Sequence, residues 1–237
     1  MQYLATDGAS GLSGVAAQTH EVWARVSPGL LDAGVTPPTM NDKAPPGQSP
    51  LDPLRSLVVA HAYQMAKQGG WDELLAWWGD ASVFAIVCSR YRNASSGWTF
   101  LHQAAYFGSE AASGGLIRWG AKVNAAAANR ETPADTANNR GHDGLADLLR
   151  AASTGESDLW VAPSDIDLLP SSNHWDEAVT CHAAEMQVAY GGGSVVIPAG
   201  TRYFADALGR TLVGWHGTYD PPGDMGGYSC CRARPGG

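Results

Sequence analysis

The sequence predicts a mainly α-helical protein, with a short array of helical repeats followed by a small α+β module that contains a β-hairpin. Two segments set 33 residues apart follow one template, so that Thr99 and Thr132 are equivalent. A fixed period of this length is typical of a stacked repeat built from a turn and two short helices. Apolar residues upstream recur at helical spacing. Near the C-terminus, two strand-like runs flank a turn that contains Gly209.

The bulk composition is that of an acidic globular chain. Its 237 residues are 44% hydrophobic and carry a net charge of -8. With only 15 basic residues, the chain lacks the clustered Lys and Arg that nucleic-acid binding requires, so we expect no nucleic-acid partner. No apolar run reaches the roughly 20 residues of a membrane-spanning helix, so we expect no membrane partner. The N-terminus lacks a secretory pattern and the four cysteines form no disulfide framework, which predicts a cytoplasmic location.

The N-terminal half is expected to pass from disorder into the helical array. Residues 1–50 are rich in Gly, Ser and Pro and bury too little apolar surface to offset their ordering entropy, although 20–26 can form a short helix. The array is predicted over 51–152. Its first helix is expected to begin near Asp52 and to end at Gly69, and a second helix is expected to begin at Trp71. This pair is interpreted as a degenerate first repeat, and 82–87 as an apolar loop.

The C-terminal part is predicted to hold a linker over 153–170, an α+β module over 171–220 and a flexible tail over 221–237. A helix is expected from about 173 to 190, ended by the glycines at 191–193. Strands are expected at 194–197 and 202–205, with a turn at 206–210 that leads into a strand from Thr211. We expect Asp206, Asp220 and Asp224 to be solvated loop acids.

The two copies resemble ankyrin repeats, whose hallmark is Thr-Pro-Leu-His followed by Ala-Ala. The first copy reads Thr99-Phe100-Leu101-His102-Gln103-Ala104-Ala105 and continues to Gly108, and the match covers roughly 97–150. Thr99 is expected to cap the first helix, and Gly108 to allow the tight turn between the helices. The resemblance implies that His102 is structural, with its ring nitrogens bonded to the backbone of adjacent turns.

Several positions depart from the ankyrin pattern. Phe100 stands in place of Pro, Arg130 in place of a turn Gly, and Asp135 in place of the second His. Gly114 and Gly115 fall inside the second helix of the first copy, where each is expected to cost about 1 kcal/mol relative to Ala. With only two clear copies, the flanking segments are expected to act as caps.

The resemblance implies a protein–protein interaction module that binds an unidentified protein partner through its concave face and turn tips. The variable contact positions fall on Trp98, Tyr106, Phe107, Glu131, Asn139 and Arg140, with Ser95, Ser96, Ala128 and Asn129 at the turn tips. Adjacent aromatic residues such as Tyr106 and Phe107 are typical of binding hot spots. The alternative is that these two rings pack on the cap helices or on the C-terminal region.

A second string favours an alternative function. Trp215-His216-Gly217-Thr218 resembles the NAD-contacting strand of poly-ADP-ribose polymerases, which implies contacts of His216 and Gly217 with NAD. Only 19 residues follow Thr218, which is too few for the rest of that fold. An enzyme, or an enzyme remnant, with its site around His216 is therefore the alternative to a binding module. A truncated gene product without a function of its own is a third.

No cofactor, metal or catalytic residue is predicted. The His and Cys residues of the last third fit no zinc template; they are His174, Cys181, His182, His216, Cys230 and Cys231. Phosphate-loop, dinucleotide and Gly-x-Ser-x-Gly patterns are missing from the sequence. The sequence therefore favours binding over catalysis.

Overall fold

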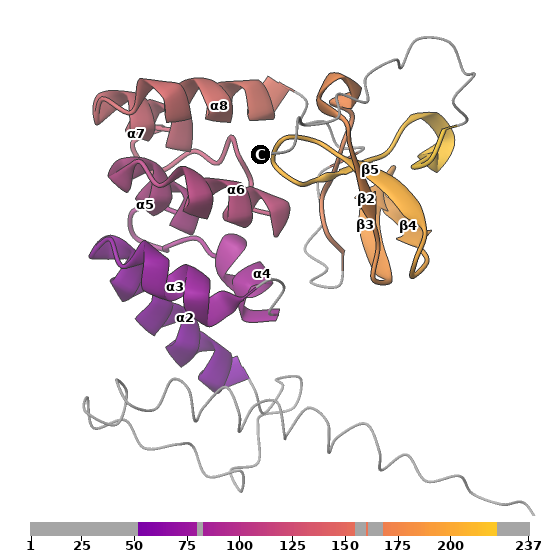
Figure 1. Cartoon of the computed structure of the whole chain (residues 1–237). Coiled ribbons are helices and arrows are strands. Elements are labelled where there is room, and N and C mark those ends of the chain that lie inside the picture. Colours follow the sequence, from indigo (N-terminus) through magenta and orange to yellow (C-terminus); the bar gives the residue numbers. More distant parts are fainter. Residues whose placement is uncertain (1–51, 80–82, 155–159, 161–167, 222–237) are drawn as a thin grey trace, which may run out of the picture. The chain divides into compact units, whose positions relative to one another are not determined.

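A computed structural model describes residues 52–79, 83–154, 160 and 168–221. These residues form seven α-helices followed by short β-strands, drawn from indigo to salmon and from orange to yellow in Figure 1. The predicted combination of helices with a small sheet region is confirmed. The predictions for 1–50, including the short helix at 20–26, and for nearly all of the tail at 221–237 lie outside the described residues, as does most of the predicted linker.

The first helical pair consists of α2 (Asp52–Lys67) and α3 (Trp71–Trp78), as predicted. Gly69 separates them with a φ of 79°, a left-handed conformation that glycine adopts without strain. Trp71, Leu74 and Trp78 place one face of α3 in the core.

The apolar loop predicted at 82–87 is wrong, because α4 (Val83–Ser89) occupies this segment. Its β-branched and aromatic residues have modest helix propensity. Ala85 and Cys88 on this helix are completely buried, and burial raises the pKa of the Cys88 thiol to about 12. Tertiary burial of this face therefore overrides the local preference of the sequence.

The first copy of the repeat forms α5 (Phe100–Phe107) and α6 (Glu110–Arg118). Thr99 caps α5, since its side chain accepts a hydrogen bond from the backbone N–H of His102. Gly108 ends α5 with a φ of 69°. A Cβ atom at Gly108 would lie 2.6 Å from Cε1 of His142, so both the backbone conformation and the space there require glycine.

The second copy forms α7 (Pro133–Asn139) and α8 (Asp143–Thr154). Asp135 is equivalent to His102 of the first copy and has the same capping role. Its Oδ2 atom accepts hydrogen bonds from the backbone N–H and the hydroxyl of Thr132, at 3.0 and 2.7 Å. These hydrogen bonds lower the pKa of Asp135. Arg130, at the position of the usual turn glycine, has a φ of 69°, which costs a non-glycine residue about 1 kcal/mol.

One apolar core joins the helices. Three of its alanines, Ala104, Ala105 and Ala137, lie on α5 and α7 and are completely buried, so these two helices pack against each other at close range. The largest buried side chains in the helical region are Trp78, Phe100, Leu74, Leu101, Leu116, Ile117 and Leu149.

Gly114 and Gly115 lie within α6 and line a hollow of about 340 Å³ together with Leu75 and Trp119. We expect Gly114→Ala to raise the free energy of unfolding by about 1 kcal/mol, because a Cβ atom there meets nothing within 4 Å and alanine restricts the unfolded chain. Urea unfolding measures this change. Gly115→Ala is the matched control with a smaller gain, since its Cβ atom would lie 3.3 Å from Cζ3 of Trp119. Equal gains at both positions would contradict the packing described here.

The C-terminal region is built from short strands. They are β1 (Ser171–Ser172), β2 (Val179–His182), β3 (Met186–Tyr190), β4 (Gly193–Ile197), β5 (Arg202–Ala205) and β6 (Thr211–Leu212). One sheet has the order β1-β6-β5-β2, with β1 parallel to β6, and β3 and β4 form a separate antiparallel hairpin. The predicted hairpin around Gly209 is confirmed, because Ala205 of β5 pairs with Thr211 of β6.

The helix predicted from about 173 to 190 is wrong. This segment holds a short 3-10 turn at Trp175–Glu177 and then β2 and β3, and no α-helix lies within the described residues 168–221. Gly191 and Gly192, expected to end a helix, instead form the two-residue loop of the β3–β4 hairpin with φ of 61° and 79°. Two consecutive positive φ angles fit the hairpin turn that matches strand twist, so the glycines favour cross-strand pairing.

Asp206 and Asp220 form ion pairs; the expectation of a solvated acid is wrong for Asp206, whereas the Asp220 side chain remains 32% exposed. Asp206 is only 3% exposed, and its Oδ2 atom lies 2.8 Å from Nε of Arg210. Asp220 pairs with Arg202 at 2.7 Å. Asp224 lies outside the described residues.

Candidate functional site

Three aromatic residues at the sequence-predicted contact positions form a continuous cluster. Trp98 belongs to the turn before α5, and Tyr106 and Phe107 belong to the last turn of that helix. The ring centroids of Trp98 and Tyr106 lie 6.1 Å apart, and those of Tyr106 and Phe107 lie 5.1 Å apart at nearly right angles. These are favourable aromatic geometries. We call these three residues the aromatic cluster.

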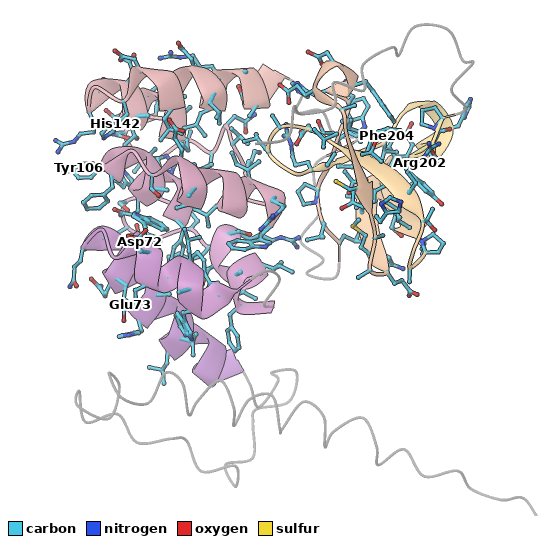
Figure 2. All side chains as sticks on the ribbon, in the orientation of Figure 1. Asp72, Glu73, Tyr106, His142, Arg202 and Phe204 are labelled. Carbon is cyan, nitrogen blue, oxygen red and sulfur yellow. The ribbon has the colours of Figure 1, made fainter. Side chains whose placement is uncertain are left out.

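The second copy contributes a cation to this cluster. The guanidinium carbon of Arg140, at the end of α7, lies 4.1 Å from the centroid of the Tyr106 ring. Nε2 of His142 is 3.3 Å from the carbonyl oxygen of Tyr106, and Figure 2 shows the two residues at the same edge of the helices. An exposed cation–π contact contributes about 0.5–1 kcal/mol. The two copies therefore build one surface at this edge.

Phe107 both packs and remains accessible. Its side chain is 40% exposed, yet its Cε1 atom lies 3.0 Å from where a Cβ atom of Gly69 would stand. One side of the ring thus contacts the α2–α3 turn. Tyr106 is half-buried. Packing on the first helical pair, the alternative raised from the sequence, accounts for part of the surface of Phe107 and leaves the rest exposed.

The other two predicted contact residues form a polar cluster. Oε1 of Glu131 accepts a hydrogen bond from the side-chain amide of Asn139 at 3.0 Å, and Oε2 accepts one from Asn129 at 2.7 Å. The Glu131 backbone N–H also donates to Oδ1 of Asn129. All six predicted contact residues therefore fall into two groups, one aromatic with Arg140 and one polar.

His102 connects the two copies and holds the turns in place. Its Nδ1 atom accepts a hydrogen bond from the backbone N–H of Thr99 at 3.1 Å, so Nε2 carries the proton that is directed at the carbonyl oxygen of Glu131, 3.2 Å away. Burial lowers the pKa of His102, which favours this neutral form. The ring stacks on Trp98 with centroids 5.6 Å apart. The predicted structural role of His102 is confirmed, and the same ring supports the aromatic cluster.

The turn before α5 and the turn before α7 are joined at their tips through their backbones. The N–H of Ala128 donates to the carbonyl oxygen of Ser96 at 2.8 Å. A Cβ atom at Gly97 would lie 2.8 Å from that same nitrogen, so glycine permits the approach. Nη2 of Arg92 donates to the carbonyl oxygen of Ala126 at 2.6 Å. These contacts give the surface a fixed frame.

A groove of about 450 Å³ lies beside the aromatic cluster, and the sequence prediction missed most of it. Trp98 and Tyr106 line it, together with Tyr63, Lys67, Asn93, Ser96 and Gln103. The amide of Gln103 donates to the Tyr63 hydroxyl at 3.1 Å, which joins α5 to α2. One signal was present in the sequence: Ala66-Lys67-Gln68-Gly69 matches Ala105-Tyr106-Phe107-Gly108 at its first and last residues, so Lys67 aligns with Tyr106.

The string around His216 is not part of a strand. β6 ends at Leu212, and Trp215–Gly217 forms a 3-10 turn in which His216 is exposed and has a φ of 60°. The strand expected from Thr211 is therefore shorter than predicted, and the resemblance to an NAD-contacting strand has no counterpart in its backbone conformation.

Two further features are missing from the described residues, a metal-binding cluster and a membrane-spanning helix. No group of three or more His, Cys, Asp or Glu side chains is placed to hold a metal ion among them. Within the same part of the chain, no helix combines the length and the apolar character needed to cross a bilayer.

Comparison with known proteins adds no relative to this picture, since no family model matches the sequence and no curated protein matches it.

Proposed function

We propose that residues 52–154 form a short ankyrin-type array that binds a protein partner through its concave face and turn tips. The proposal is supported by the local features that the ankyrin resemblance implies. Each clear copy begins with a threonine that caps its first helix, Thr99 or Thr132. A glycine of positive φ, Gly108 or Gly141, lies between its two helices. The mechanism is recognition by surface complementarity, without turnover.

The observation that carries the proposal is the partly exposed aromatic cluster on a rigid frame. Binding hot spots are enriched in Trp, Tyr and Arg, and these residue types meet at Trp98, Tyr106 and Arg140. The Trp98 ring stacks on His102, and the Tyr106 ring contacts both Trp98 and Phe107, so less side-chain entropy is lost when a partner docks. If Phe107 served only to pack the core, its ring would be buried more completely than it is.

The test compares the wild-type chain with a Tyr106→Ala, Phe107→Ala double variant in affinity capture from the native lysate. We expect a captured protein to be lost with the variant, because truncating two hot-spot rings costs about 2 kcal/mol or more, a decrease in affinity of about 30-fold or more. A Val179→Ala, Val196→Ala variant is the matched control, since it removes two exposed apolar side chains from the strand region.

Circular dichroism verifies that both variants keep the helical content of the wild type. The proposal fails if the same proteins bind the wild type, the folded aromatic variant and the valine control equally well.

A further inference from the structure

Resting on the proposed function, we infer that the partner presents an acidic segment, in which carboxylates flank an apolar or aromatic anchor residue. The anchor fills the groove beside Trp98 and Tyr106, and the carboxylates contact Lys67 and Arg140. Three features of the molecule favour such a partner: the distribution of charge over the helices, the position of the two cations, and the lining of the groove.

Charge is distributed unevenly between the two sides of the array. The first-helix face consists of α2, α5 and α7, Arg140, and the turns at 91–99 and 124–132. Among side chains that the structure describes, it carries four cations and two carboxylates, whereas the second helices α3, α6 and α8 carry two cations and five carboxylates. Asp72 and Glu73, marked in Figure 2, belong to this second group and lie in the first turn of α3, where the helix dipole favours negative charge. The first-helix face is thus cationic in a chain with a net charge of -8.

Two of these cations adjoin the aromatic residues. Lys67 lines the groove, and Arg140 covers the Tyr106 ring, which lines the same groove. A guanidinium stacked on a ring keeps its N–H donors directed outward in the plane of the group, where they match the geometry of a carboxylate. A carboxylate bound there adds a charge-assisted hydrogen bond to the aromatic contact.

Two of the carboxylates on the first-helix face are already engaged locally. Both side-chain oxygens of Glu131 accept hydrogen bonds from asparagine amides, and Oδ2 of Asp135 accepts two from Thr132. These hydrogen bonds hold the two carboxylates within their own turns. Charge complementarity therefore favours an anionic partner at this face over a cationic one.

The groove itself suits an apolar anchor. Tyr63, Trp98 and Tyr106 supply its aromatic lining, and about 450 Å³ accommodates a large side chain and adjoining backbone. Asn93 and Gln103 also line the groove, where Oδ1 of Asn93 accepts hydrogen bonds from the backbone N–H groups of Ser95 and Ser96 and the Gln103 amide donates to Tyr63, so these two side chains fix the groove wall. An acidic segment with an aromatic or aliphatic residue matches both the lining and the charge.

The experiment selects a displayed library of random peptides on the full-length chain and sequences the peptides that are retained. We expect enrichment of Asp and Glu around a Trp, Phe or Leu residue. The most enriched peptide, labelled with a fluorophore, is then titrated by fluorescence polarisation. A Lys67→Glu, Arg140→Glu variant should bind it at least about tenfold more weakly, and added salt should weaken wild-type binding.

A Lys122→Glu, Arg150→Glu variant is the matched control, because it has the same change in net charge at exposed residues away from the groove. This control should bind the peptide as the wild type does. Retained peptides that are basic or show no charge preference, or equal binding by both charge variants, would overturn the inference. If the retained peptides bind the Tyr106→Ala, Phe107→Ala variant as tightly as the wild type, the proposed function itself fails. The failure of the proposed function is therefore distinguishable from the failure of this inference.

Discussion

Phe100→Ala is expected to lower the free energy of unfolding by about 4 kcal/mol, the typical cost of truncating a buried phenylalanine. The side chain is completely buried, and its ring makes edge contacts with Tyr63, Trp78 and Tyr91 at centroid distances of 5.2, 5.7 and 5.9 Å. It thus joins α2, α3 and the turn before α5. Urea unfolding followed by tryptophan fluorescence and by far-ultraviolet circular dichroism measures the loss.

Two controls distinguish the contribution of the Phe100 ring to stability from effects on the backbone and from general effects of truncating a side chain. Phe107→Ala, at the other end of the same helix, removes a side chain that is 40% exposed and should cost far less. Phe100→Pro places at the first helical position the residue that the second copy has there, Pro133, and the backbone at this position tolerates proline. We expect Phe100→Pro to destabilise nearly as strongly as Phe100→Ala, because the ring is lost in both. A stable proline variant would show that the aromatic contacts contribute little.

Asp206→Ala is expected to destabilise the chain by about 3–5 kcal/mol, because it leaves the buried Arg210 guanidinium without its carboxylate. Oδ1 of Asp206 accepts hydrogen bonds from the backbone N–H groups of Leu208 and Arg210, at 3.0 and 2.9 Å, and Oδ2 accepts one from Nε of Arg210. The side chain of Asp206 is 0% exposed and that of Arg210 is 6% exposed. The Asp206 carboxylate therefore stabilises the turn at 206–210 and compensates the buried charge of Arg210.

A double-variant cycle tests this interpretation by urea unfolding. Asp206→Asn keeps an acceptor for the backbone N–H groups, and Arg210→Met removes the buried cation while keeping apolar volume. The combined variant should be more stable than Asp206→Asn alone, since no unpaired charge remains buried. As a further control, Asp220→Asn breaks the more exposed pair with Arg202 and should cost about 1 kcal/mol or less. Additive losses in the cycle would show that Asp206 and Arg210 are not coupled.

The candidate site was partly predictable because a repeat transfers positions from one copy to the next. Trp98, Tyr106 and Arg140 were predicted from their places in the template, and the structure brings them into contact. The groove was not predicted, since Tyr63 and Lys67 come from α2, where only Ala66 and Gly69 match the template of the two copies. The local pattern gave no indication that Gln103 would bond to Tyr63 across two helices.

The sequence by itself determined the elements whose causes are local. Threonine caps, the glycines at positive φ and apolar residues at helical spacing act within a few residues, so α2, α3, the helical pairs α5–α6 and α7–α8 and the turn at Gly209 were predicted correctly. Tertiary structure decided the rest: α4 forms because Ala85 and Cys88 are buried, β2 and β3 form because strands pair, and Asp206 is buried because Arg210 pairs with it. Burial, strand pairing and ion pairing depend on partners that only the folded chain supplies, and they outweigh local propensities of less than about 1 kcal/mol per residue.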